Sequence, residues 1–426
     1  MRAALIAALA TGCGAPLAPH HAPSAVDATT ALPSELGSPR AIAADDARIY
    51  LVADGVAADH APPTVSAWHD GLAIWRQDLD GAPTALAVTG AAVIAGLTRM
   101  PPASRGQPGA FVAALDREHG APHWQLAFDA TDWSTINQLA ALGDDVIVGG
   151  AFAGTLRAAG RVVSSAGASD GFVARVRSTG EVAWLVRVGG AGADAIQGVA
   201  ARGHAIAIAG SFAAGAELLG EPLVAADART PNADVFVAVL DDAGQRGWSA
   251  SFGGRGNDAC AGVAITDRGE LAVAASIEAP IAVAGHQVAP RGAGDGVVVW
   301  YSATGQVGAV AQLGGNDFDG LRAIAATGDR AIVAGFFSGS IALGVRTLTA
   351  GGGDDAFVAE LATNGVVGGA WQVGGEGREE VTALAAVPGG FAIAIAHSAR
   401  ASVDDAALPA PAPGHAGGAF AIRGVR

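Results

Sequence analysis

Acidic residues that recur at an almost constant spacing are the first candidates for chemistry in this sequence: Asp194, Asp258, Asp319 and Glu379. Each stands five residues before an apolar residue of a predicted strand, at Val199, Val263, Ile324 and Leu384. Carboxylate oxygens are ligands that Ca²⁺ prefers, so a converging set could hold a calcium ion. The alternative is that each carboxylate accepts hydrogen bonds within its own turn. Regular repetition favours the turn, because a metal site needs its ligands to meet at one point.

A second acidic set precedes another predicted strand in the same way, at Asp170, Asp234, Asp295 and Asp355. Carboxylates at this spacing lie too far apart to act together on one bond. Residues 167–171, GASDG, match the pattern of a serine-hydrolase elbow, which needs a strand, a tight turn and a helix. The equivalent segments of other copies, GAGDG and GGDDA, stand before another strand, so we reject the match.

Thiol and imidazole groups give no stronger signal of catalysis. Cys260 aligns with apolar residues of other copies, so we expect a packed strand residue rather than a nucleophile. The ten histidines show neither an HExxH pattern nor another metal-ligand spacing. We therefore expect no catalytic residue, no bound cofactor and no enzymatic activity.

Three tryptophans, Trp124, Trp184 and Trp248, occupy equivalent positions in successive copies of a repeat. We expect them to pack between neighbouring repeats. Indole rings that stay exposed could instead stack on sugar rings, so their exposure separates the two interpretations.

The elements that must position these residues come from a repeat of about 60 residues. The apolar residue that opens an FVA-like strand recurs at Phe111, Phe172, Phe236, Val297, Phe357 and Phe420. Each copy predicts four strands separated by turns, with an additional ribbon in the long gap between the second and third strands, as at residues 155–167. Four strands per repeat are typical of a β-propeller blade.

Seven second strands predict an all-β chain folded as one seven-bladed propeller; they begin near Ile49, Val93, Val146, Ile206, Leu271, Ile332 and Phe391. The last copy lacks a fourth strand, and residues 28–37 stand where other copies carry one. We expect this segment to complete the last blade and close the ring, since an open ring would leave two free edges. The alternatives are a β-solenoid, whose coils are much shorter, or a pair of sandwiches.

The first residues, MRAALIAALATGC, combine one positive charge, a short apolar run and small residues before Cys13. We predict an export signal of the lipoprotein type over residues 1–12, lipidation of Cys13, a Pro/Ala-rich tether over 13–26 and the propeller over 27–426. The alternative is a plain signal peptide with an incidental cysteine. The expected location is the outer membrane or cell surface, otherwise the periplasm or the exterior.

The net charge is −15, and all 25 basic residues are arginine. An acidic surface repels phosphate backbones, so we expect no nucleic-acid partner. No apolar run approaches the ~20 residues that span a bilayer, which leaves the N-terminal lipid as the only expected contact with the membrane. We expect a monomer.

Several segments together resemble the SBBP-type β-propeller repeats of bacterial surface proteins: SFAAG, SSAGASDGFVAR, STGEVAW and VGGAG. The resemblance covers about residues 134–400 and implies a fold and a surface location, but no shared activity. The segments ALDREHGAPHW and VRSTGEVAW, each a turn followed by a tryptophan, also resemble the blades of quinoprotein-like propellers, which include outer-membrane assembly scaffolds and dehydrogenases. The fifth copy, GAVAQLGG, departs from that pattern because it lacks the tryptophan.

These observations favour a non-catalytic interaction module that presents loops to a protein partner. The alternatives are a propeller that binds carbohydrate or another surface polymer, and an enzyme of the lactonase, lyase or quinoprotein type. An enzyme would be indicated by one blade with clustered His, Asp, Arg or Tyr facing the axis. Propellers host unrelated functions, so the fold alone does not decide between these hypotheses.

Overall fold

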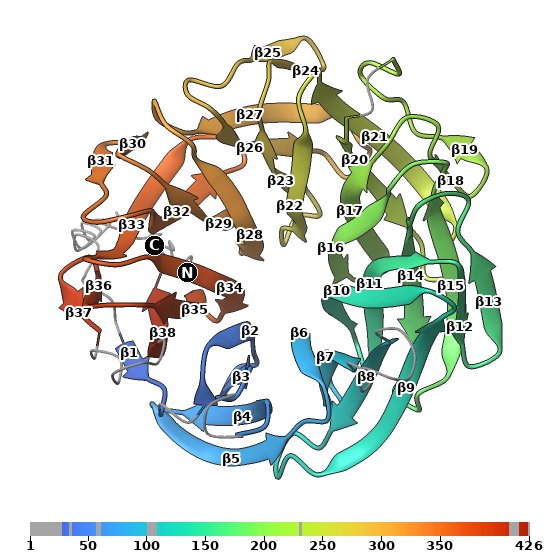
Figure 1. Ribbon diagram of the computed structural model, residues 1–426, viewed down its shortest axis with the longest axis horizontal. Coiled ribbons are helices and arrows are strands. Elements are labelled where there is room, and N and C mark those ends of the chain that lie inside the picture. Colours follow the sequence, from blue (N-terminus) through green and yellow to red (C-terminus); the bar gives the residue numbers. More distant parts are fainter. Residues whose placement is uncertain are drawn as a thin grey trace, which may run out of the picture.

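The computed structural model describes residues 28–33, 36–56, 61–99, 109–229, 232–408 and 417–424. Within these ranges every regular element is a β-strand, and no helix is long and apolar enough to cross a membrane. Seven antiparallel sheets stand around a central axis like the blades of a propeller (Figure 1). The predicted seven-bladed propeller is therefore confirmed.

The fourth blade shows how the sequence forms a sheet. It consists of β16 (Ala195–Arg202), β17 (Ala205–Phe212), β20 (Asp234–Leu240) and β21 (Arg246–Gly254), ordered from the axis outward. The second and third strands are apolar and buried along most of their length. Blades pack against both faces of these strands, so their side chains are buried on both sides instead of alternating between core and solvent.

The other six blades repeat this order of strands. The first three are β2 (Pro39–Ala44), β3 (Ile49–Ala53), β4 (Thr64–His69), β5 (Leu72–Asp78); β6 (Ala82–Val88), β7 (Val93–Arg99), β8 (Gly109–Leu115), β9 (Pro122–Ala130); and β10 (Trp133–Leu142), β11 (Asp145–Ala153), β14 (Asp170–Val176), β15 (Val182–Gly189). The last three are β22 (Asp258–Ile265), β23 (Leu271–Ile277), β26 (Asp295–Tyr301), β27 (Val307–Leu313); β28 (Gly320–Thr327), β29 (Arg330–Phe337), β32 (Asp355–Ala362), β33 (Val367–Gly375); and β34 (Glu379–Val387), β35 (Gly390–His397), β38 (Gly417–Gly424), β1 (Ala28–Ala31).

The ring closes as the sequence predicts, through the strand that precedes the first blade. β1 pairs antiparallel with β38, and Thr30 lies opposite Phe420. The amide of Leu32 then donates to the carbonyl of Gly418 at 2.9 Å. The closing strand itself ends at Ala31, so only the first part of the predicted segment 28–37 pairs with the last blade.

The additional ribbons are present, and they join a blade other than their own. The ribbon β12 (Thr155–Ala158) and β13 (Arg161–Ser164) lies between strands of the third blade in sequence, but it pairs with β9 of the second. The ribbons β18 (Glu217–Leu218) with β19 (Glu221–Pro222), β24 (Ile281–Val283) with β25 (His286–Val288), and β36 (Ala401–Val403) with β37 (Ala406–Ala407) likewise extend the preceding blade. A further ribbon, β30 (Ser340–Leu343) with β31 (Arg346–Thr349), reaches the fifth blade through the bridge between Gly315 and Ile341. Each ribbon therefore covers an outer edge and ties two blades together.

Candidate functional site

The first acidic set lies at the connections between blades, one residue per junction. Asp194 accepts a hydrogen bond from the amide of Gly190 at 2.7 Å, and Asp258 accepts one from Gly254 at 2.8 Å. Asp319 accepts in the same way from the amide of Gly315 at 2.6 Å. These bonds within a turn are what the turn interpretation predicts.

A member of the second acidic set stands beside each of these carboxylates. A Cβ placed on Gly189 would lie 2.7 Å from Cγ of Asp170 and 2.9 Å from Oδ2 of Asp194, so the two side chains border one small space. Burial, reinforced by the neighbouring carboxylate, raises the pKa of Asp194, and it raises the pKa of Asp258 to about 7. The second set has its own donors; Gln372, for example, donates to Asp355 at 2.6 Å.

Glu379 differs from the three aspartates at the equivalent position. Its longer side chain is 1 % exposed, and within the described chain neither carboxylate oxygen has a hydrogen-bond partner of normal geometry. Burial, followed by repulsion from Asp355, raises the pKa of Glu379 to about 7.

The four carboxylates belong to four different junctions, so they do not form one metal site. Among the described residues, no group of three or more His, Cys, Asp or Glu side chains could hold a metal ion. The speculative calcium site at Asp194, Asp258, Asp319 and Glu379 therefore finds no support in the geometry.

Cys260 lies in β22 and is 8 % exposed. Burial raises the pKa of its thiol to about 12, which keeps the group protonated and weakly nucleophilic at neutral pH. This placement agrees with the packed residue that the sequence predicts.

The repeated tryptophans join neighbouring blades. The indole Nε1 of Trp124 donates to the carbonyl of Ser178 at 2.8 Å, and Trp184 donates to Asp242 at 2.9 Å. Trp248 donates to Ala303 at 3.0 Å. Each acceptor lies in the turn between the third and fourth strands of the next blade, and all three rings are half-buried. A fourth such residue, Trp75, makes the same contact with Arg117 and was missed because the first copy of the repeat is altered.

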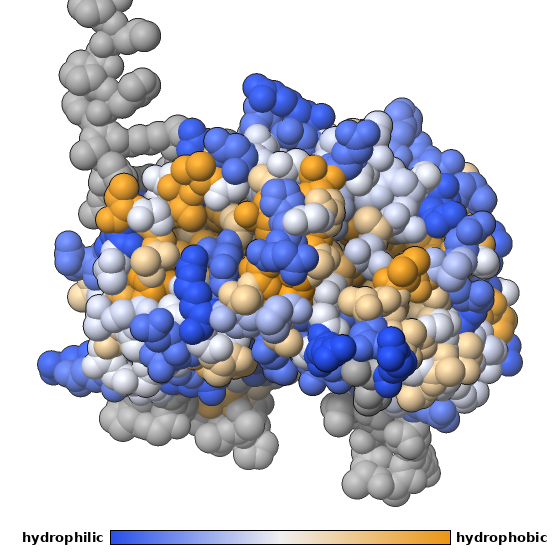
Figure 2. All heavy atoms as spheres, turned by 90° about the horizontal axis from the view of Figure 1, so that it is seen from above, coloured by the Kyte–Doolittle hydropathy of each residue, from blue (hydrophilic) through white to orange (hydrophobic). Residues whose placement is uncertain are grey.

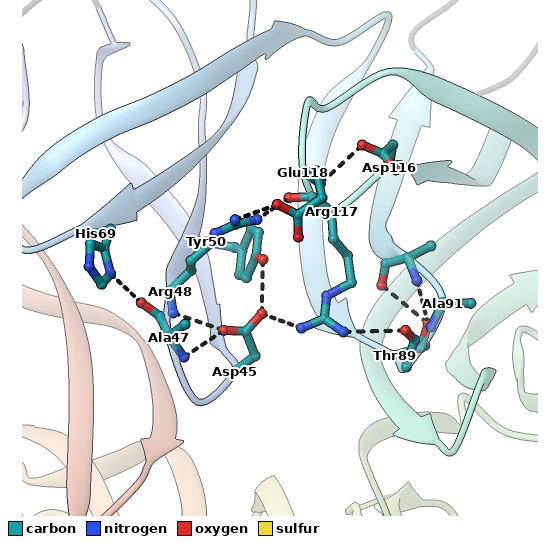
Figure 3. Close-up of polar contacts among 12 residues, drawn as sticks. Asp45, Ala47, Arg48, Tyr50, His69, Thr89, Ala91, Asp116, Arg117 and Glu118 are labelled. Carbon is teal, nitrogen blue, oxygen red and sulfur yellow. Dashed lines mark hydrogen bonds and ion pairs between the residues drawn. The ribbon is translucent and has the colours of Figure 1, made fainter.

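One polar cluster has the composition expected of an enzyme site (Figure 3). Asp45 accepts hydrogen bonds from Tyr50 and Arg117, and Arg48 forms an ion pair with Glu118 at 2.5 Å. The cluster joins the turn of the first blade between β2 and β3 to the turn of the second blade between β8 and β9, and Tyr50 is fully buried. These contacts stabilise the junction of the two blades.

A feature shared by all seven blades points to a different site. In every innermost strand the pairing shifts by one residue, which leaves a β-bulge residue without a partner in the second strand: Arg40, Thr84, Asn137, Gln197, Ala261, Arg322 and Thr382. A bulge re-aims one side chain, and here all seven line the same axial cavity. The innermost strands surround the axis in Figure 1. We call these residues the bulge ring.

Six members of the bulge ring also line a larger cavity of about 620 Å³ at one end of the axis, which we call the axial pocket. Phe318 and Asn257 contribute from connections between blades, and Ile277, Glu278 and Phe336 from the ends of second strands. This volume lies within the range of small-molecule sites, roughly 300–1,000 Å³. Because its lining residues come from these connections and from strand ends, the pocket opens toward the face that carries the connections between blades.

Two arginines line the axial pocket, and their surroundings differ. Arg40 is paired with Asp54 at 2.5 Å. Arg322 is exposed and lies over the ring of Phe336, 5.0 Å from its centroid, without an ion pair to any described carboxylate. Seen from its side, outside the axial pocket, the disc shows apolar patches interrupted by hydrophilic side chains (Figure 2).

The sequence predictions did not include the bulge ring, although a signal for it is present. In β16 the residues Ile196 and Val199 are both buried, three positions apart, which breaks the alternation of a regular strand. The inner strands of the other copies have an irregularity at the same place. In β16 the bulge-ring member is Gln197, the residue directly after Ile196.

The predicted export signal, the lipidated Cys13 and the tether lie outside the described residues. Their assignment rests on the sequence alone.

No model of a known protein family matches the chain. No curated protein matches it either.

Solved structures with a similar arrangement include the quinohemoprotein alcohol dehydrogenase of Comamonas testosteroni. Its sequence is 11 % identical, the match covers 93 % of this chain and 76 % of that one, and the TM-score is 0.43. The WD40 domain of Neurospora crassa Pan2 has 10 % identity, coverage of 90 % and 89 %, and a TM-score of 0.45. An ulvan lyase, a polysaccharide lyase, has 11 % identity, coverage of 88 % and 93 %, and a TM-score of 0.49. Likeness at this level concerns the propeller architecture alone, and the activities in these names say nothing about this chain.

Proposed function

We propose that the chain is a non-catalytic binding module that takes its ligand into the axial pocket. The observation that carries the proposal is the bulge ring, because seven equivalent backbone irregularities aim side chains of different chemistry at one cavity. A regular frame with varied residues at the centre suits recognition.

The titratable groups that attract attention in the sequence are engaged in other roles. Asp194 and Asp319 each accept two backbone amides, and Cys260 is packed inside a strand. The half-buried tryptophans hold blades together through their indole nitrogens, which argues against sugar stacking on those three rings. The axial pocket is the better location for a ligand.

The most direct test fills the pocket. Ala261 is a small member of the bulge ring and lines the axial pocket, so Ala261→Trp places an indole inside it. Binding of a panel of neutral and acidic oligosaccharides, small anions and peptides is measured by calorimetry, and each bound ligand is recovered and weighed by mass spectrometry. We expect the unaltered chain to bind at least one class and to return it unchanged, and Ala261→Trp to abolish that binding.

A matched control is Val224→Trp, which adds an indole at an exposed position that lines neither axial cavity. Conversion of the ligand would show an enzyme instead. Binding that survives Ala261→Trp would place the site elsewhere.

We further propose that a lipid on Cys13 holds the module at the cell envelope, as the N-terminal sequence suggests. Metabolic labelling with a fatty-acid probe should mark the chain, and Cys13→Ser should remove the label and release the protein from the membrane fraction. Labelling that persists in Cys13→Ser would contradict this assignment.

A further inference from the structure

We infer that the axial pocket binds an acidic sugar, a ring that carries one carboxylate among several hydroxyls; this inference rests on the proposed function. Arg322 supplies the first reason. Its guanidinium contacts Phe336 and has no carboxylate partner within the described chain, whereas Asp54 neutralises Arg40. An unpaired guanidinium in a cavity offers parallel N–H donors that match a carboxylate.

The aromatic wall beside Arg322 supplies the second reason. Phe318 is 46 % exposed, and its ring centroid lies 5.5 Å from that of Phe336. Both rings line the axial pocket. The face of an aromatic ring is electron-rich and attracts the C–H bonds on the apolar face of a sugar. Cation and aromatic surface therefore adjoin, as an acidic ring would require.

The polar side chains of the pocket supply the third reason. The side-chain carbonyl of Gln197 accepts a hydrogen bond from the backbone amide of Ser211 at 2.8 Å, which leaves the side-chain amino group of Gln197 available. The Asn137 amino group donates to the carbonyl of Ile196 at 2.8 Å, and its side-chain oxygen accepts the Thr135 hydroxyl at 3.5 Å, which leaves one lone pair on that oxygen. In the described chain the Thr84 hydroxyl is buried without a partner. Separate donors and acceptors suit sugar hydroxyls, which both donate and accept.

The remaining charges limit the number of negative groups on the ligand. Glu278 is exposed and lines the same pocket, and the whole chain carries a net charge of −15. Densely phosphorylated or sulfated chains are repelled by such a field. A single carboxylate per recognised unit satisfies Arg322 without that cost.

The test compares disaccharides that differ only by one carboxylate. Pairs such as cellobiouronic acid and cellobiose, together with galacto and manno counterparts, are titrated into the full chain by calorimetry. In at least one series we expect the acid to bind about tenfold more tightly than the neutral sugar, with the difference shrinking as salt rises. Arg322→Gln should remove the difference, and Phe318→Ala should weaken both ligands.

Arg268→Gln is the matched control, because Arg268 is an exposed arginine paired with Asp329 away from the axial pocket. Equal affinity for acid and neutral sugar in every series, or an unchanged difference in Arg322→Gln, would overturn the inference. A peptide or neutral ligand that Ala261→Trp excludes would overturn the ligand class and leave the proposed function standing. If Ala261→Trp changes no binding at all, both fail.

Discussion

The junctions between the first five blades and the junctions that complete the ring solve the same packing problem with different residues. In the first region a tryptophan on each outer strand, Trp75, Trp124, Trp184 or Trp248, donates to a turn carbonyl of the next blade. In the second region the equivalent positions of the fifth and sixth blades carry Ala309 and Gly369. The ring nevertheless closes, so the propeller does not depend on one type of contact at every junction.

The second region leaves space that the first region fills. A cavity of about 420 Å³ lies beside Gly369, with Trp371 and Arg346 in its wall. The Trp371 ring instead packs against Phe391, with the ring centroids 5.0 Å apart, and the Arg423 guanidinium lies over the Trp371 ring, 4.8 Å from its centroid. The tryptophan of this blade lies two residues further along the strand, and it contacts the second and third strands of the next blade instead of the turn.

The largest expected effect breaks a tryptophan contact. Trp184→Ala removes a half-buried indole together with its hydrogen bond to Asp242, and it leaves a cavity between the third and fourth blades. We expect the free energy of unfolding to fall by about 3 kcal/mol, measured by chemical denaturation. Trp133→Ala, at a more exposed tryptophan outside these contacts, should cost less than about 1 kcal/mol. Equal losses would show that the contact between blades contributes nothing special.

A smaller effect distinguishes the turns that face these positions. Gly244 and Gly365 both have a positive φ, of 76° and 81°. A Cβ on Gly244 would lie 2.8 Å from the Trp184 ring, but one on Gly365 would lie 3.5 Å from Cβ of Ala309. Gly244→Ala should therefore cost about 2–3 kcal/mol, and Gly365→Ala only the backbone strain of about 1 kcal/mol. Thermal unfolding of the two variants measures the difference; a reversed order would contradict the contact with Trp184.

Two individual junctions, one from each region, also differ in the hydrogen bonds that their buried carboxylate accepts. Asp194, in the first region, accepts two amides, whereas Glu379, in the second, has no partner of normal geometry in the described chain. At pH 8 we expect Asp194→Asn to cost about 1–2 kcal/mol, since an amide cannot accept both bonds. Glu379→Gln should be neutral or stabilising by about 1 kcal/mol, because it removes a buried charge. Denaturation at pH 8 tests the pair, and a large loss in Glu379→Gln would reveal a partner for that carboxylate.

A pH titration of stability tests a property that buried carboxylates of both regions share, with the smallest change to the protein. The pKa of both Asp258 and Glu379 is about 7 in the folded chain, well above the ordinary value of a carboxyl group. The folded state then binds more protons than the unfolded state between about pH 4 and pH 7, so stability falls as pH rises through this window and is level above it. Melting temperatures should be higher at pH 5 than at pH 8. Asp258→Asn with Glu379→Gln should flatten the profile, whereas Glu181→Gln, at an exposed side chain, should not.

Much of the fold could be predicted from the sequence because each repeat carries local signals. The second strand of the fourth blade begins at Ala205, next to the predicted Ile206, and closure by the segment before the first blade follows from a missing strand at the end. The attachment of the ribbons to the preceding blade could not be predicted in this way. It depends on which outer strand lies nearby in space, and a turn and two short strands contain no information about that partner.

The candidate site was the less predictable part. The most regular acidic residues, such as Asp194 and Asp258, owe their spacing to the turns that connect blades and not to a shared site. Gln197 and Arg322 carried no motif, and only the break in strand alternation distinguishes them. A site assembled from one residue per blade becomes visible when the strands are placed around an axis, because no two of its members are near in sequence.

The measurement that tests the central claim most directly is a crystal structure of the full chain with the tightest ligand of the binding panel. The account predicts density for the ligand in the axial pocket, with its carboxylate on the Arg322 guanidinium and its ring on Phe318. Well-ordered ligand bound elsewhere, with the bulge ring untouched, would contradict the claim that the propeller recognises its ligand along the axis.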